Sequence, residues 1–248
     1  MNTFVKEKSF YKNYFSLVFH IAIQNAIMQS LTITDKLILG TYNIDSFTGA
    51  SLITPIQMLI PMGIGEVAMI FISRYWGKND IQSIKKLISL SVRIALFTSL
   101  LFTLISFLMP EQIIGIFSDS PGIKTEGVKY LKIVCFSFVM LSLNSALFAI
   151  LRSIETIKIG LIIASSTCCT NLLLNYVLIF GKFGFPELGV IGSALATLIA
   201  RIIEFLIIVI YLKYFDKKIK LKLKDFLKID TQLLKNFLKI GYPIIIAN

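Results

Sequence analysis

The sequence predicts an all-α membrane protein: a bundle of six transmembrane helices, followed by the start of a seventh. Hydrophobic residues make up 56% of the 248 residues and the mean hydropathy is +0.79. An ordinary soluble domain has an apolar content of only roughly 45–50%. The apolar residues also gather into runs that can cross a hydrocarbon core, which takes about 20 residues of helix. Six such runs lie near residues 14–39, 47–73, 84–108, 127–151, 157–180 and 188–213.

The first two runs have unusual compositions. The first contains more polar side chains than a helix surrounded by lipid tolerates, namely Gln24, Asn25, Gln29, Thr32, Thr34 and Asp35. One side of it should therefore face protein or water. The second contains Pro55 and Pro61, with Gly63 and Gly65 close behind, and should be bent because each proline removes a backbone donor. The third and fourth runs are plainer, and we expect them mainly to pack.

The distribution of positive charge predicts the orientation of the helices. The net charge is +11, and the basic residues gather in the N-terminal tail and in the gaps after the second and fourth runs. Because cytoplasmic loops carry the excess of Lys and Arg, both ends of the six-helix segment should lie in the cytoplasm of a multi-pass plasma-membrane protein. The partner of this charge is then the lipid bilayer and not nucleic acid. The residues counted are Lys6, Lys8, Lys12, Arg74, Lys78, Lys85, Lys86, Arg152 and Lys158.

The composition divides the chain into three parts. Residues 1–214 form the six-helix transmembrane unit. Residues 215–235 are rich in lysine and aliphatic side chains, which is typical either of an amphipathic helix on an anionic cytoplasmic leaflet or of a plain linker. Residues 236–248 begin a seventh apolar helix. The cysteines, Cys135, Cys168 and Cys169, all lie inside apolar runs, where we expect them to pack as small residues.

Four oxygen-bearing side chains are expected at similar depth in the outer half of the membrane. At about 1.5 Å per residue, Asp35 lies roughly 6–8 Å from the outer end of the first span. By the same measure Asn175 lies roughly 8 Å, and Thr197 roughly 13 Å, from the outer ends of their spans. Asn171 is one turn deeper on the face of Asn175. Together they suit Na⁺, or a proton on Asp35 with the amides as partners; the alternative is that they only join helices by hydrogen bonds.

Lys36 follows Asp35, but consecutive helical residues point about 100° apart. We therefore expect Lys36 to reach toward the outer interface and not to neutralise the aspartate. Deeper in the membrane lie Glu66, Arg201 and Glu204. Arg201 and Glu204 are three residues apart on one helix face, which is typical of an ion pair within a helix, whereas a role in an inner gate would also use Glu66. Depth does not decide between these two interpretations.

A catalytic site or a resident metal is not expected. His20 is the one histidine of the sequence, so a catalytic triad or a histidine metal site has too few ligands. The sequence Gly63-Ile-Gly65 follows no strand and marks helix bending, not a phosphate loop. We therefore predict that the protein is not an enzyme and needs no cofactor beyond a coupling ion.

Several stretches carry a family resemblance. They are TDKLILG at 34–40, TPIQMLIPMGIG at 54–65, SRYWGKND at 73–80, LRSIETIK at 151–158, NLLLNYVLIFGKFGFPELGVIGSALAT at 171–197 and LKIGYP at 238–243. In this order they resemble the N-terminal half of a MATE transporter, the multidrug and toxic compound extrusion family within a larger flippase superfamily. The resemblance covers almost the whole chain, and 171–197 is its most specific part.

The resemblance implies a secondary antiporter that exports organic cations or other amphipathic compounds in exchange for Na⁺ or H⁺. It also implies that Asp35, Asn171, Asn175 and Thr197 form the cation site of the N-terminal lobe. Some members have a second aspartate where this chain has Asn175, which leaves the coupling ion open. A flippase for a lipid-linked precursor is the nearest alternative, and a non-transporting membrane scaffold is one of another class.

The family's transporters have twelve helices in two six-helix lobes, so the resemblance implies a C-terminal lobe as partner. The chain ends at Asn248, within the expected seventh helix. We expect it to be a fragment of a longer product; two copies that assemble into one cavity are the alternative.

Overall fold

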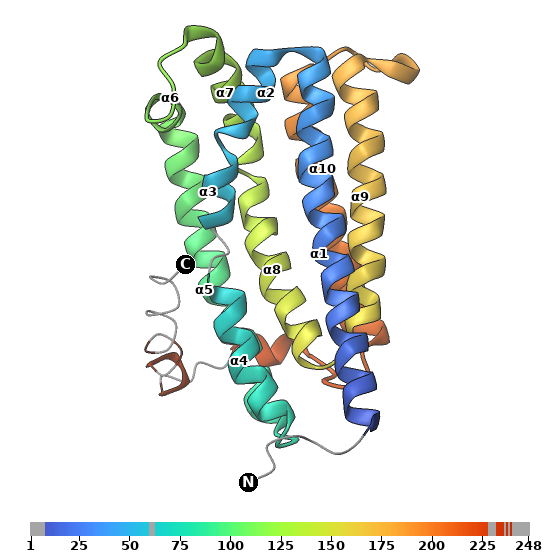
Figure 1. The fold of residues 1–248 in the computed structure, drawn as a ribbon. Helices are drawn as coiled ribbons and strands as arrows, with labels where there is room; N and C mark the ends of the chain where they lie inside the picture. The colour runs from blue at the N-terminus through green and yellow to red at the C-terminus, as the bar shows by residue number, and fades with distance from the viewer. Residues whose placement is uncertain (1–7, 60–62, 228–231, 236, 238, 240–248) are drawn as a thin grey trace.

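A computed structural model describes residues 8–59, 63–227, 232–235, 237 and 239, and it is built of helices throughout (Figure 1). The α-helices of the described residues are, in order, α1 (Lys8–Tyr42), α2 (Ile44–Ser51), α3 (Thr54–Leu59), α4 (Ile64–Trp76), α5 (Ile81–Leu108), α6 (Pro110–Gly115), α7 (Pro121–Val134), α8 (Ser137–Ser153), α9 (Ile157–Phe180) and α10 (Val190–Ile210). Three short elements of other helical type follow α9 or α10: η1 (Lys182–Gly184), η2 (Tyr211–Phe215) and η3 (Leu223–Leu227).

Four of the expected spans are continuous helices. α1, α5, α9 and α10 are each long and apolar enough to cross a membrane, and α9 has the bounds expected from the sequence. The stretch Ile44–Trp76 meets the same criteria as a broken span, and α7 with α8 meets them as a bent pair. The all-α membrane class and a bundle of up to six spans are therefore confirmed.

The second expected span, 47–73, is divided into α2, α3 and α4, as its proline and glycine residues predict. Asn43 begins α2, where its side-chain oxygen accepts hydrogen bonds from the backbone N–H groups of Asp45 at 2.7 Å and Ser46 at 3.3 Å. Gly63 precedes α4 with a φ of 77°, a backbone conformation that residues other than glycine rarely adopt. Pro61, one of the residues expected to cause the bend, lies outside the described residues.

The fourth expected span, 127–151, is not the plain helix that the sequence predicts. α7 and α8 meet at an angle of 57°. At the break, the Ser137 hydroxyl donates to the Val134 carbonyl at 2.6 Å, and Thr103 of α5 donates to the Cys135 carbonyl at 3.0 Å. The Ser137 hydroxyl thus bonds a carbonyl at the end of α7, whereas the Cys135 carbonyl accepts the Phe138 N–H at 3.1 Å as well as the Thr103 hydroxyl. The contact from Thr103 is a tertiary one, so the sequence pattern of this span does not reveal the bend.

The helices pack in two groups that α10 joins. α9 packs on α1 and α10, whereas α8 packs on α4 and α5; α10 also contacts α7 and α8. In Figure 1 the pair α1 and α9 lies on one side of the bundle and α5 with α4 on the other. Large buried aliphatic side chains fill the second group, for example Ile72, Leu87 and Leu151. The helices that carry the expected cation-site residues, α1, α9 and α10, thus contact one another.

In the hairpin between α9 and α10, the backbones of the two helices pack closely together. Gly181 ends α9 in the left-handed conformation, with φ of 63°, and the Leu188 N–H then donates to the Leu178 carbonyl at 3.0 Å. At Gly192, a Cβ would lie 2.5 Å from that same carbonyl oxygen. Only glycine therefore permits α10 to approach α9 this closely.

We expect Gly192→Ala to destabilise the protein by about 1–3 kcal/mol, since α10 must move away from α9 to accommodate the methyl group. The measurement is thermal unfolding of the purified protein in detergent. Gly77→Ala is the matched control, because a Cβ at Gly77 meets no atom closer than 3.7 Å. An unchanged unfolding temperature for Gly192→Ala would show that the close approach does not contribute to stability.

The segment after α10 is not the continuous amphipathic helix that was one expectation for 215–235. After η2 the chain is irregular, because the Asp216 carboxylate accepts the backbone N–H groups of Lys218, Ile219 and Lys220 at 3.0–3.2 Å. The η3 turn then packs on α5. The Asp225 carboxylate accepts the Lys222 N–H and pairs with Lys85 at 3.1 Å, and these contacts hold the pKa of Asp225 below its usual value.

The expected seventh helix, 236–248, falls outside the described residues apart from positions 237 and 239.

Candidate cation site and adjoining cavity

The four side chains expected at one depth do meet in the folded chain. Asn175 on α9 donates from Nδ2 to Asp35 Oδ1 on α1, and also to Asn171 Oδ1 at 2.9 Å. Thr197 on α10 donates to Asp35 Oδ2 at 3.4 Å. Asn171 and Asn175 are buried, with 3% and 0% of their surface exposed. Three helices that pack side by side therefore place one carboxylate, two amides and a hydroxyl in a single cluster.

The cluster borders a small internal cavity of about 40 Å³. A single water needs roughly 10–15 Å³ by the same measure, so the cavity has room for a small ion or a few waters. Asn175 Oδ1 is a buried acceptor without a hydrogen-bond partner among the described residues. Asp35, Asn171 and Thr197 line the cavity, which leaves space for a further group beside the carboxylate.

The cavity is also lined by residues that the sequence analysis did not select. Thr167 lies four residues before Asn171 on the same face of α9, so its spacing could have revealed it. Gln57 on α3 and Tyr130 on α7 carry no such signal. Both belong to spans that are broken or bent, and only the tertiary arrangement brings them to Asp35. Tyr130 is 5% exposed and closes one side of the site.

Lys36 does not reach toward the outer interface as expected. Its ammonium group donates to the Thr54 hydroxyl at the start of α3. The break between α2 and α3 places Thr54 beside α1, and this nearby acceptor holds the lysine inside the bundle. Lys36 consequently lines the same small cavity as Asp35, although its ammonium points to another helix. Its positive charge stays close to the cluster.

The deeper polar residues form an ion-paired network. Arg201 Nη1 and Glu204 Oε2 are 2.9 Å apart, and Asn144 on α8 donates to the same Glu204 oxygen at 2.7 Å and to the Arg201 carbonyl at 3.2 Å. Glu204 has no exposed surface. The ion pair expected within α10 is therefore present. Asn144, which the sequence analysis did not select, ties it to α8.

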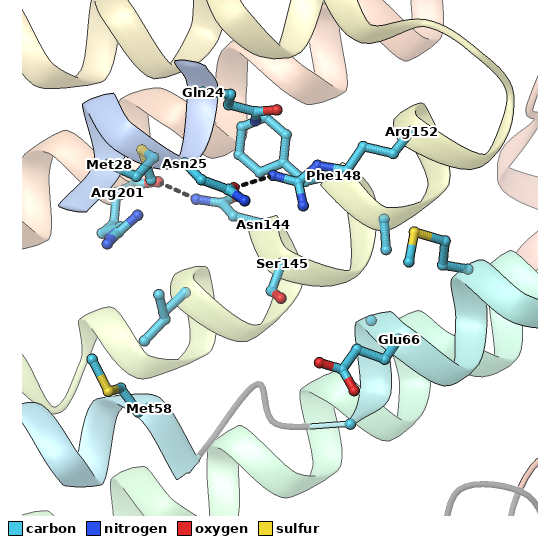
Figure 2. A pocket seen from close by; sticks show the side chains of 15 residues that line it. Gln24, Asn25, Met28, Met58, Glu66, Asn144, Ser145, Phe148, Arg152 and Arg201 are labelled. Carbon is cyan, nitrogen blue, oxygen red and sulfur yellow. Dashed lines mark hydrogen bonds between the residues drawn. The ribbon is translucent and has the colours of Figure 1, made fainter. Parts of the chain in front are cut away.

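Glu66 lies apart from this ion pair, on the wall of a larger open cavity of about 580 Å³ (Figure 2). Arg201 and Asn144 line this cavity, as do Gln24 and Asn25 of α1, so part of the polar side of α1 faces protein or an open cavity, as expected. Figure 2 shows Arg152 donating to Asn25 Oδ1, at 2.9 Å. Arg201 and Leu141 line both cavities and so stand between them.

A bundle of continuous and broken apolar helices around a half-buried carboxylate defines a multi-pass membrane protein with an internal polar site. The chain belongs to the MatE family, whose model matches residues 21–177, more than half of the chain.

The curated relatives extend this assignment. A probable multidrug resistance protein NorM of Thermotoga maritima is 27% identical over 229 residues, which are 91% of this chain and 49% of that protein. The uncharacterized transporter YisQ of Bacillus subtilis is also 27% identical. The match includes 92% of this chain and 51% of that protein. The chain thus spans about half the length of the curated relatives it matches.

Solved structures agree with the fold. A MOP superfamily transporter from Pyrococcus furiosus has a TM-score of 0.84 and 18% identity, with 95% of this chain matched to 52% of that one. An outward-facing MATE family transporter of the MOP superfamily gives the same values. Since roughly half of each of these chains is matched, the fold found here is that of one half of such a transporter.

Proposed function

We propose that this chain is the N-terminal lobe of a secondary antiporter that exports organic cations or other amphipathic compounds in exchange for Na⁺ or H⁺. The observation that carries the proposal is the meeting of Asp35 with Asn175 and Thr197 beside a small cavity. A carboxylate inside a membrane costs roughly 2.5–3.5 kcal/mol on insertion scales, and such groups usually serve ion pathways. Membership of the MatE family, and the names of its multidrug relatives, support the same activity.

The site offers oxygen atoms in an arrangement that suits a small cation. Asp35 supplies the negative charge, and the side-chain oxygens of Asn171, Asn175 and Thr197 supply neutral ligands for Na⁺. If the ion is a proton, it resides on Asp35, and the amides then hydrogen-bond to the neutral acid. Either ion would remove the negative charge that the membrane disfavours.

The larger cavity is the proposed place of the exported compound. Its volume of about 580 Å³ lies within the roughly 300–1,000 Å³ of typical ligand pockets. Methionine and amide side chains line its wall together with Phe148, and the carboxylate of Glu66 lies on the same wall. Because Arg201 and Leu141 separate it from the small cavity, a shift of α10 on ion binding would reach the compound directly.

The test is efflux from cells that produce the protein at its full encoded length. Such cells should lose ethidium faster than cells without it, and dissipating either the sodium or the proton gradient separately should identify the coupling ion. Equal rates of ethidium loss with and without the protein would refute the proposal. That result would instead favour a non-transporting membrane scaffold, in which Asp35 only joins helices by hydrogen bonds.

A flippase for a lipid-linked precursor is a second candidate because of Arg152. This arginine lines the larger cavity, and among the described residues its side chain donates to an amide, that of Asn25, and forms no salt bridge with a carboxylate. Its Nε is buried without a partner there. An arginine of this kind suits a phosphate group. Movement of a fluorescent polyprenyl phosphate across proteoliposomes, without ethidium transport, would favour the flippase.

We also propose that the N-terminal end of α1 faces the cytoplasm of the plasma membrane. In a background without Cys135, Cys168 and Cys169, Phe183→Cys in the α9–α10 hairpin should react with a membrane-impermeant maleimide on intact cells. Phe183 is 84% exposed, so its reactivity depends on its side of the membrane. Lys158→Cys should react only after the cells are permeabilised. The reverse pattern would contradict the orientation.

A further inference from the structure

A groove unrelated to the cation site lies among α5, α8 and α10. It encloses about 730 Å³. Its walls are aliphatic and aromatic, and its deepest residues, Leu143, Leu147 and Leu212, are 5–7% exposed. Val209 at its edge is 37% exposed, so the groove opens on the outer surface of the bundle. Such a groove can accept a slender apolar chain from the surrounding lipid.

The groove is closed at one end by the segment after α10. Phe226 and Leu221 of this segment line it. The Phe226 carbonyl accepts hydrogen bonds from Ser89 at 3.2 Å and from Arg93, both on α5. Lys85, also on α5, pairs with Asp225 and donates to the Lys220 carbonyl at 3.1 Å. These contacts hold the segment against α5, so the closed end of the groove is an ordered part of the fold.

Three exposed lysines surround this closed end: Lys213, Lys222 and Lys224. None of these three lysines forms a salt bridge with another described residue. The acids nearest to them in sequence have other partners: Asp216 accepts three backbone N–H groups, and Asp225 pairs with Lys85. An apolar groove is therefore joined to an excess of positive charge at one end.

We propose that this groove binds one anionic phospholipid, with an acyl chain along Leu143, Leu147 and Phe205 and the phosphate group between the lysines. Basic pockets between transmembrane helices recognise anionic headgroups in this way, because lysines near the membrane surface attract negatively charged lipids. A zwitterionic lipid offers the same chain but no net negative charge. The lipid also bridges α10 and the segment that follows it, and so stabilises the end of the bundle where a second lobe would connect.

The experiment is native mass spectrometry of the whole chain, released from detergent containing equal amounts of phosphatidylglycerol and phosphatidylcholine with identical acyl chains. The wild-type protein should retain phosphatidylglycerol at least about tenfold more than phosphatidylcholine. Lys213→Gln, Lys222→Gln and Lys224→Gln together should reduce this preference to about twofold or less. Equal retention of the two lipids by the wild type, or an unchanged preference in the triple variant, would overturn the proposal.

The matched control carries the same three charge changes at the other end of the bundle. Lys124→Gln, Lys129→Gln and Lys132→Gln lie on α7, which Figure 1 places near the end opposite the segment after α10. This control should keep the wild-type preference; loss of preference in both variants would mean that net charge alone attracts the lipid. Val209→Trp, which fills the groove without changing charge, should also reduce phosphatidylglycerol retention. Retention by that variant would place the lipid outside the groove.

Discussion

Asp35→Asn is expected to abolish cation-driven export and to weaken binding of the coupling ion. The substitution keeps the shape of the side chain but removes the negative charge. A hydrogen bond or ion contact to a charged group contributes about 1.5–3 kcal/mol, which corresponds to roughly 10- to 150-fold in affinity. The measurements are ethidium efflux from cells and ²²Na⁺ binding to the purified protein.

Asp119→Asn is the control for this prediction. Asp119 has the same chemistry, but its side chain is fully exposed beside Lys124 in the loop before α7. It should leave efflux and ²²Na⁺ binding unchanged. If Asp35→Asn keeps wild-type efflux, Asp35 serves only to join α1 to α9 and α10. If efflux is lost but the wild type binds no ²²Na⁺, the coupling ion is a proton.

Arg201→Met is expected to have the largest effect on stability. It leaves Glu204, which has no exposed surface, with Asn144 as its remaining hydrogen-bond donor among the described residues. Removing one partner of a buried ion pair costs about 3–5 kcal/mol, because the other charge is left uncompensated. For a chain of this size the unfolding temperature in detergent should fall by on the order of 10 °C.

A second substitution distinguishes this effect from simple loss of packing. Arg201→Met combined with Glu204→Met removes both charges, and replacing a whole buried pair by apolar residues is often neutral or stabilising. The double variant should therefore recover most of the lost unfolding temperature. A double variant as unstable as Arg201→Met would mean that the arginine stabilises α10 through packing, and not through its charge.

The continuous spans could be predicted because lipid imposes a simple rule on sequence. A helix such as α9 satisfies its own backbone hydrogen bonds and needs only a long apolar run, so its bounds follow from composition. The broken second span could also be predicted, since proline and glycine act through the local backbone. The bend between α7 and α8 could not, because the hydrogen bond at the break from the Thr103 hydroxyl to the Cys135 carbonyl comes from another helix, α5.

The candidate site divides in the same way. Asp35, Asn171, Asn175 and Thr197 could be selected because each is polar inside an apolar run and all lie at one depth. Tyr130 and Gln57 could not, and the predicted direction of Lys36 was wrong. Its acceptor, Thr54, reaches α1 only because α2 and α3 are separate helices. That these residues bind a cation stays a prediction for the experiments above.

The sequence alone determined the membrane class, the number of spans and the polar residues that the bilayer would not tolerate unpaired. Each of these follows from the length, hydropathy and depth of single helices, which are local properties in a solvent of fixed thickness. The tertiary structure decided which helices are neighbours, and therefore that Asp35 meets Asn175, that Asn144 secures Glu204 and that three lysines surround one groove. Contacts between helices depend on packing and on breaks in the backbone, and the pattern of a single span contains neither.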